Sequence, residues 1–397
     1  MNPDIIIEII NKPADLYWGP VIAQYFFFTG ISAAAFLISS LTYVFNQKRY
    51  EPIAGLALIV AFTVLAAAPL NLIADLAQPG RFYTLLYRTH ITSPMSWGVF
   101  LLTSYPLLIL LEGLFVFRAR FARHSQTAQG IVRALYMLAA LGNPAVTEAT
   151  QRRDRRISRW LGIIGIPMAL AVHGYTGFIL WFAAGRPLWN TPLMPAVFLV
   201  SALVSGLALM ILLTWLMAPD ADGKPRWPLI ESLALILSGF IAVDLALRAL
   251  WHGLSYAADP QTYSPVLTFL FEVRFMDSVV VELGLTLLLP LLVFVIPRLR
   301  RMRVLFLLAA LLTLIGVFFF RWNTVIGGQE IPRYLAGYLH FVPTTEELML
   351  VAANWGLWIF LMLVATTFIP WQETTEHARM DSSLPTAGSA LQGGVSS

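Results

Sequence analysis

The chain has 397 residues, of which 58% are hydrophobic and only 12% are charged. A soluble domain carries charge on about a quarter of its residues, so this composition excludes a soluble protein and indicates a polytopic membrane protein. The absence of cysteine excludes iron-sulfur clusters, thiolate metal sites and disulfides within the chain itself. The formal net charge of +4 is small, and its distribution is more informative than its size.

Taken in chain order, nine apolar stretches are long enough to cross a bilayer, which takes about 20 helical residues. Lipid offers the backbone no hydrogen-bond partner, so each stretch is expected to be a helix. The sequence therefore predicts an all-α, polytopic membrane helical bundle of about nine transmembrane helices. The stretches are residues 18–45, 53–77, 95–117, 160–184, 193–217, 229–251, 279–296, 303–320 and 348–369.

The Lys and Arg residues of the connecting segments predict an orientation. With nine spans, eighteen of them fall on one side of the membrane and seven, Arg321 among them, on the other, while Arg248 lies inside a span. Because basic loops stay in the cytoplasm, the amino terminus is expected outside and the carboxyl terminus inside. The basic segment Arg118–Arg159 is expected to meet anionic lipid rather than nucleic acid.

Several segments outside the spans also carry expectations. The outer segments His252–Ser278 and Arg321–Glu347 are rich in Pro, Tyr, Phe and charge, so they are expected to be loops that offer a docking surface. Residues Val132–Leu141 are apolar but too few to cross, which favours a helix at the membrane surface. Residues 1–371 form the predicted transmembrane domain, and 372–397, rich in Ser, Thr, Gly and Ala, form a tail expected to be disordered and cytoplasmic.

Polar side chains inside the spans gather in the half of the membrane assigned to the outside. Such residues are costly in lipid and are functional candidates by default. Each also has a structural interpretation, because an i,i+4 acid–base pair can neutralise itself, a glutamate near an interface can extend to water, and a histidine can bond a neighbouring helix. The candidates are Tyr25, Asn71, Asp75, His173, Tyr175, Asp244, Arg248 and Glu282.

The combination of tyrosine, histidine and acid on different helices at similar depth predicts a polar pocket suited to a headgroup with two carbonyls and an apolar tail. Haem is not expected, because a membrane haem usually takes two axial histidines on facing helices. Of the six histidines, His173 alone lies deep within a predicted span. No metal site is predicted.

Five stretches of the first half, in this order, resemble the NrfD/PsrC family of integral membrane subunits of respiratory oxidoreductases, which includes the polysulfide reductase membrane subunit. They are YFFFTGISAAA from Tyr25, DLAQPGRF from Asp75, SPMSWG from Ser93, HGYTG from His173, and RPLWNTPLMPAVFLVSAL from Arg186. The second half is similar only in hydropathy. Members commonly have eight or ten spans arranged as two four-helix bundles, so nine spans imply eight plus one.

The resemblance implies a subunit of a bacterial or archaeal cytoplasmic membrane that exchanges electrons between quinone and an iron-sulfur subunit docked on the outer face. That partner would connect to a molybdopterin or multihaem catalytic subunit. The family's quinone site uses a tyrosine of the fourth span, here Tyr175, and a polar residue of the first span, often His, whose place is taken by Tyr25.

The leading hypothesis is that menaquinol or another quinone binds near the outer face. Tyr25, Tyr175, His173 and Asn71 would bind it, and His173 and Asp75 would accept protons, which suits a histidine because its ordinary pKa lies near neutrality. One alternative is a proton- or ion-translocating subunit without a redox site, with Asp244, Arg248, Glu282 and His173 as a relay. A passive membrane anchor is the other.

Overall fold

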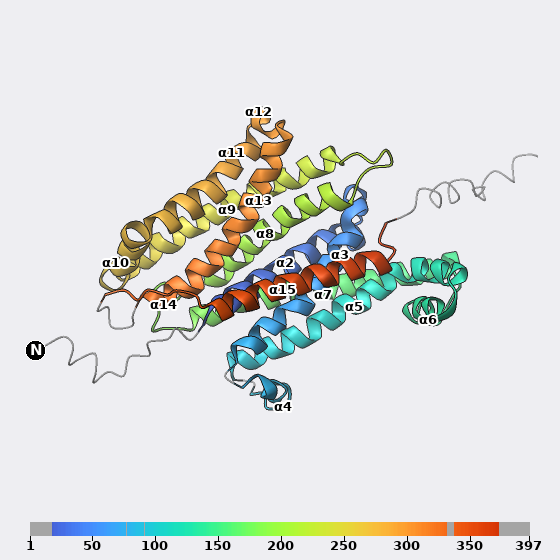
Figure 1. Ribbon diagram of the computed structural model, residues 1–397, viewed down its shortest axis with the longest axis horizontal. Coiled ribbons are helices and arrows are strands. Elements are labelled where there is room, and N and C mark those ends of the chain that lie inside the picture. The colour runs from blue at the N-terminus through green and yellow to red at the C-terminus, as the bar shows by residue number, and fades with distance from the viewer. Residues whose placement is uncertain (1–17, 77, 91, 332–336, 373–397) are drawn as a thin grey trace, which may run out of the picture.

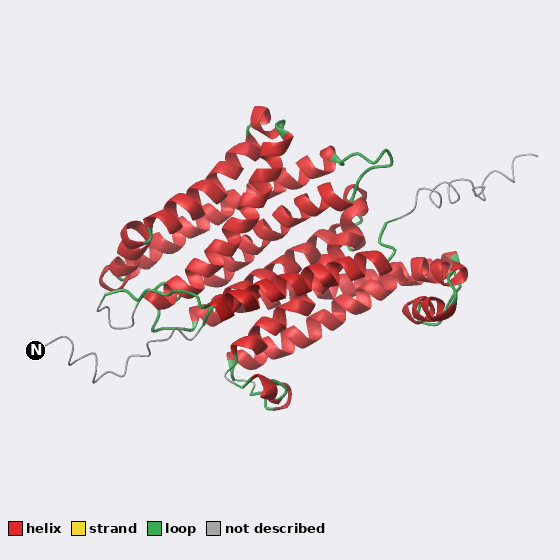
Figure 2. Ribbon diagram, in the orientation of Figure 1, coloured by secondary structure: helices red, strands yellow, loops and turns green. Residues whose placement is uncertain are grey.

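The computed structural model describes residues 18–76, 78–90, 92–331 and 337–372. Within these ranges the regular elements are helices and no strand is present (Figure 2). Nine of the described helices are long and apolar enough to cross a membrane, which confirms the predicted fold class. They are α2 (Pro20–Tyr43), α3 (Glu51–Asp75), α5 (Pro94–Thr127), α7 (Glu148–Trp181), α8 (Met194–Met217), α9 (Trp227–Ala258), η4 with α11 (Met276–Leu288, Leu289–Val295), α13 (Arg303–Trp322) and α15 (Thr345–Phe368).

Eight of these spans form two four-helix bundles with the same order of packing (Figure 1). In the first bundle α2 packs on α3 and α7, while α5 packs on α3 and α7. In the second, α8 packs on α9 and α13, while the η4–α11 span packs on α9 and α13. The two bundles meet through α2 and α7 of the first and α8 and α13 of the second. Each bundle thus uses its first and last helix to contact the other.

Helix α2 is the centre of the assembly, because it packs on α3, α7, α8, α13 and α15 and 94% of its most apolar window is buried. Small residues permit this packing. A Cβ atom added at Gly206 of α8 would overlap Ala34 of α2, and one added at Gly30 would lie 2.9 Å from Cε1 of His173. Membrane helices usually associate by close packing through small residues, because the hydrophobic effect does not drive association between helices in lipid.

The ninth span, α15, lies outside both bundles and packs on α3 and α2. Its connection to them is partly polar. The Gln24 amide donates to the Val351 carbonyl at 3.0 Å, and the Asn354 amide donates to the Ala67 carbonyl at 3.3 Å. This arrangement agrees with the expectation of eight spans plus one.

Shorter elements gather at the two ends of the bundles, named here the α10 end and the α6 end (Figure 1). The α10 end carries η2 (Pro79–Arg81), α4 (Thr84–Tyr87), α10 (Pro260–Thr268), η3 (Phe269–Val273), η5 (Asn323–Gly327) and α14 (Gly328–Glu330). The α6 end carries η1 (Lys48–Tyr50), α6 (Gly130–Ala139) and α12 (Pro297–Arg300). The helix predicted near Val132–Leu141 is therefore present as α6.

Two sequence-based expectations about the connecting segments are wrong. Residues 252–278 are not a loop, because α9 continues to Ala258 and is followed by α10 and the π-helix η3. Arg321 is not in a loop either, because it belongs to α13 and is completely buried. Removing Arg321 from the less basic side increases the charge asymmetry between the ends. The tail predicted to be disordered lies outside the described residues, except for Gln372, whose amide donates to the Met217 carbonyl.

The contact between Gly206 and α2 generates a prediction about stability. Gly206→Ala forces a methyl group against Ala34 and should destabilise the protein by about 1–3 kcal/mol, the usual cost of overpacking. Gly239→Ala in α9 is the matched control, because a Cβ atom there meets nothing within 4 Å. Thermal unfolding of the two variants in the same detergent measures the difference, and equal melting temperatures would contradict the close packing of α2 on α8.

Candidate functional site

Tyr25 and Tyr175 form the first group of predicted site residues. Tyr25 of α2 is buried, Tyr175 of α7 is partly buried, and the two hydroxyl groups are close enough to interact electrostatically. The Tyr175 ring lies directly against Gly98 of α5, where any Cβ atom would overlap it. The glycine that ends the SPMSWG stretch is thus required by the tyrosine of the HGYTG stretch. The geometry places two phenol groups between α2, α5 and α7 near the α10 end.

Asn71 and Asp75 lie one turn apart at the end of α3, close to the first turn of α2. Asn71 is buried and lines a cavity of about 180 Å³ with Val21 of α2 and Asn354 of α15. Its Nδ2 atom and the Oδ1 atom of Asn354 have no hydrogen-bond partner among the described residues. Asp75 lies against the backbone of Gly19, where the positive end of the α2 dipole favours a carboxylate.

His173 belongs to a different group, at the interface between the bundles. Its Nε2 atom lies 2.8 Å from the Phe198 carbonyl oxygen and its Nδ1 atom lies 3.5 Å from Oγ1 of Thr29. Nε2 also lies 3.1 Å from Nη2 of Arg321, so this nitrogen faces both a carbonyl, which can only accept, and a guanidinium, which can only donate. Arg321 also donates to the Phe198 carbonyl at 2.9 Å, and to Oγ of Ser201 at 2.7 Å. The histidine ring is therefore held by α2, α8 and α13.

The faces of α7 explain why His173 and Tyr175 separate. Residues two apart on an α-helix point about 200° away from each other. Tyr175 faces α5 and Tyr25, whereas His173 faces α8 and the second bundle. The structure thus brings together Tyr25 with Tyr175, and His173 with Arg321, but not all four in one pocket.

The second bundle contains a buried ion network formed by the other predicted residues. Nε of Arg248 donates to Asp244 at 2.7 Å, and its Nη1 donates to Glu282. The second Glu282 oxygen accepts from the Asn323 amide at 2.6 Å. The guanidinium of Arg248 also lies over the Phe320 ring, 3.8 Å from its centroid, a favourable cation–π position. The pairing of Asp244 with Arg248 expected from their spacing is present, and Glu282 is bound within it rather than extended to water.

Arg321 completes the charge balance of this network, although the sequence pattern did not single it out. Its guanidinium lies 3.9 Å from the Phe198 ring centroid and interacts electrostatically with Asp244. Two buried guanidiniums are thus present with two buried carboxylates, but both ion pairs are formed by Arg248, and Nε and Nη1 of Arg321 have no hydrogen-bond partner among the described residues. A signal was present in the sequence, because Arg321 is followed by WNTVIGG rather than by a run of turn residues, and in the structure the helical path runs on to Glu330.

Two further buried polar residues are not among the sequence-based candidates. Asn354 of α15 faces Asn71, and Glu112 of α5 is completely buried. Neither Glu112 oxygen has a hydrogen-bond partner among the described residues. In the same ranges, no group of three or more His, Asp or Glu side chains is arranged to hold a metal ion.

The ion network generates a prediction about stability. Glu282→Gln keeps the size of the side chain but leaves two buried guanidiniums facing one carboxylate, so a loss of about 3–5 kcal/mol is expected. Glu148→Gln removes the carboxylate of an exposed pair with Arg152, 2.7 Å apart, and should cost less than about 1 kcal/mol. Denaturant unfolding of both variants in one detergent tests this, and equal losses would mean that the network is not a closed buried one.

Comparison with known proteins gives one consistent answer. Residues 8–333 match the family described as "Polysulphide reductase, NrfD". The chain is 34% identical to the C subunit of selenate reductase from Mesobacillus selenatarsenatis, over 80% of this chain and 75% of that protein. It is 26% identical to the C subunit of tetrathionate reductase from Salmonella typhimurium, over 91% of this chain and 94% of that protein. It is also 26% identical to the Hdr-like menaquinol oxidoreductase integral membrane subunit of Archaeoglobus fulgidus, over 81% of this chain and 73% of that protein. This multi-pass membrane protein belongs to the NrfD family of polysulfide reductase membrane subunits.

Proposed function

We propose that this chain is the quinone-reactive membrane subunit of a respiratory reductase complex, with its quinone site between α2, α3, α5 and α7 near the α10 end. The observation that carries the proposal is that Tyr25 and Tyr175, two hydroxyl donors from different helices, lie near enough to interact electrostatically, with the Tyr175 ring packed on Gly98 and partly exposed. The names of the relatives support it, since they are subunits of selenate and tetrathionate reductases and of a menaquinol oxidoreductase.

The side chains around this place fit a quinone. The two tyrosine hydroxyls can hydrogen-bond its oxygens, and the unpaired Asn71 amide offers a further donor on α3. Close to Gly98, the lipid-facing surface of α5 exposes Met95, Trp97 and Phe100. Ligand pockets of this kind combine an apolar wall with a few placed polar groups. An isoprenoid tail would lie along the exposed apolar wall while the headgroup reaches the tyrosines.

Bound there, menaquinol or a similar quinol supplies two electrons and two protons. The residues of this chain orient the headgroup and take up protons. Asp75 is suited to accept a proton, because it is only partly buried at the end of α3 and can pass the proton to water. His173, which is fully enclosed and bonded, is proposed instead to hold α7 against α8 and α13, and so to fix the depth of Tyr175.

The α10 end is proposed as the outer face and the docking surface. It exposes Phe82, Tyr83 and Tyr87 around α4, and Phe271 and Phe275 in and after η3. Exposed aromatic groups of this density suit a protein partner. The partner would be an iron-sulfur subunit that receives the electrons and passes them to a molybdopterin or multihaem subunit. The basic α6 end would face the cytoplasm of a bacterium or archaeon.

A proton relay through Asp244, Arg248, Glu282 and His173 has less support. The described hydrogen bonds of the two carboxylates and of Arg248 are with one another and with Asn323, while Oδ1 of Asp244 and Nη2 of Arg248 have no partner among the described residues. A relay needs groups that can change partners between the two sides of the membrane. Because its hydrogen bonds stay within the second bundle, the network suits a fixed connection between helices better than a path for protons.

The proposed role of Tyr175 has a direct test. Tyr175→Phe removes one hydrogen bond to the headgroup, so quinol turnover by the complete complex should fall by about tenfold, while the complex still assembles. Tyr136→Phe, on α6 at the opposite end of the molecule, is the control and should leave turnover unchanged. Turnover with a soluble menaquinol analogue and gel filtration of the complex are the measurements. Unchanged turnover of the Tyr175→Phe complex would falsify the assignment.

The proposed orientation can be tested because the chain has no cysteine of its own. Thr92→Cys lies at the α10 end and Asp222→Cys at the α6 end, and both positions are exposed. In right-side-out vesicles a membrane-impermeant maleimide should label only the first variant. In inverted vesicles it should label only the second. The reverse pattern would place the α10 end, and with it the proposed docking surface, in the cytoplasm.

A further inference from the structure

A large cavity lies at the α6 end, far from the tyrosine pair. Its volume is about 880 Å³. It lies between the end of α2, the stretch of α5 from Phe115 to His124 and the stretch of α7 from Gln151 to Ile163, with Pro370 and Gln372 at its edge. The proposed quinone site makes no use of this cavity.

The lining of the cavity is strongly basic. Five arginines face it against two acidic residues, Glu51 and Asp154. Asp154 is already neutralised, because the buried Arg118 donates to it from within α5. Among the residues that the structure describes, four of the five arginines have no ion-pair or hydrogen-bond partner. These four are Arg123, Arg155, Arg156 and Arg159.

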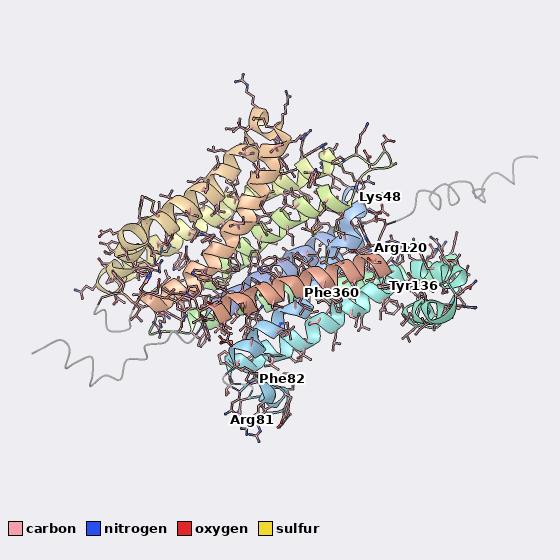
Figure 3. The ribbon with its side chains drawn as sticks, in the orientation of Figure 1. Lys48, Arg81, Phe82, Arg120, Tyr136 and Phe360 are labelled. Carbon is pink, nitrogen blue, oxygen red and sulfur yellow. The ribbon has the colours of Figure 1, made fainter. Side chains whose placement is uncertain are left out.

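The fifth arginine shows how the cavity is built. Nη1 of Arg120 donates to the carbonyls of Pro370 and Trp371, at 3.3 and 2.6 Å, and so attaches the end of the last span to α5. Figure 3 shows Arg120 at this end of the molecule with Tyr136 of α6 nearby. Tyr136 in turn contacts His124, whose ring centroid is 5.6 Å away and which also lines the cavity. The cavity lining is therefore held in place by contacts of α5 with α6 and with the end of the last span.

One side of the cavity is apolar and continuous with the surface that faces lipid. Trp160 and Ile163 line the cavity and are 62% and 39% exposed, and Ile164 beside them is 51% exposed. The adjoining helix α6 exposes Ile131, Leu135 and Leu138, which suits a helix lying at the membrane surface. The cavity thus joins free guanidiniums to an apolar surface at the level where lipid headgroups are found.

We propose that this cavity binds the phosphodiester headgroup of an anionic phospholipid, with the acyl chains along Trp160 and Ile163 of α7. Guanidinium groups bind phosphate oxygens through paired N–H donors, and four of them without partners match a headgroup with one or two phosphates. A soluble phosphate would use the arginines but not the apolar wall. Basic pockets between transmembrane helices are suitable places for anionic lipid headgroups.

The bound lipid has a structural consequence. Its headgroup contacts both α5, through Arg123, and α7, through Arg155, Arg156 and Arg159. It neutralises like charges that otherwise repel one another across the cavity. The lipid therefore stabilises the α6 end of the first bundle, and this role is independent of whether the other end binds a quinone.

The test compares two variants that each remove two positive charges from the same end of the molecule. Arg123→Gln/Arg159→Gln takes one arginine from each wall of the cavity. Arg298→Gln/Arg301→Gln is the control, because both residues are exposed near α12 and do not line the cavity. Native mass spectrometry of the purified proteins measures retained phosphatidylglycerol and cardiolipin. Affinity of the cavity variant for these lipids should fall about tenfold or more, since each basic residue near anionic lipid contributes roughly fivefold.

The proposal is overturned if both variants lose lipid equally, if neither does, or if millimolar inorganic phosphate displaces the lipid from the wild-type protein. A second measurement needs no variant. Phosphatidylglycerol added to the delipidated wild-type protein should raise its melting temperature, because a ligand that binds the folded state stabilises it, whereas phosphatidylethanolamine should have little effect. Equal shifts with the two lipids would also contradict an anion site.

Discussion

The structure depends on placing two arginines inside a bundle that excludes water. Arg248 and Arg321 are buried in the second bundle, and each lies against an aromatic ring, 3.8 and 3.9 Å from the ring centroids of Phe320 and Phe198. A charge in so apolar an environment is tolerated only when opposite charge and hydrogen bonds surround it. Asp244 of α9 and Glu282 of η4 supply that charge. The helices of the second bundle are therefore connected by one balanced set of ions.

One of these arginines, Arg321, also connects the second bundle to the first. Arg321 and His173 both contact the carbonyl oxygen of Phe198. Helix α13, the last of the second bundle, and helix α7, the last of the first bundle, therefore both contact α8. Thr29 and Gly30 of α2 complete the contact from the other side. Because α2 is enclosed by five other helices, any shift at this point moves the helix that carries Tyr25. The position of the tyrosine pair is thus set by polar contacts on the opposite face of α7.

Much of the fold was predictable because the physical constraints that dominate it are simple. Nine apolar stretches of sufficient length give the number and type of spans, and the depth of each polar residue follows from its distance to the end of its span. The contacts between helices could not be predicted from the sequence. Glu282 pairs with Arg248, a residue 34 positions away, and nothing in one sequence encodes that pairing. Arg321 was assigned to a loop because a hydropathy boundary stops at a charge, whereas the helix continues through it.

The separation of the candidate residues into two groups could nevertheless be predicted from the helical period. His173 and Tyr175 are two residues apart, so one helix could not direct both toward one ligand. The physical difference between the bundles supports this division. In the second bundle Asp244 and Glu282 are both paired with Arg248, although Oδ1 of Asp244, Nη2 of Arg248, and Nε and Nη1 of Arg321 have no hydrogen-bond partner among the described residues. In the first bundle, near the α10 end, the tyrosines are neutral and the Asn71 amide is unpaired among the described residues, so hydrogen bonds remain to be made. Both groups thus keep unmet hydrogen-bonding capacity, but that of the first bundle lies beside the partly exposed Tyr175, whereas Asp244 and Arg321 are completely buried.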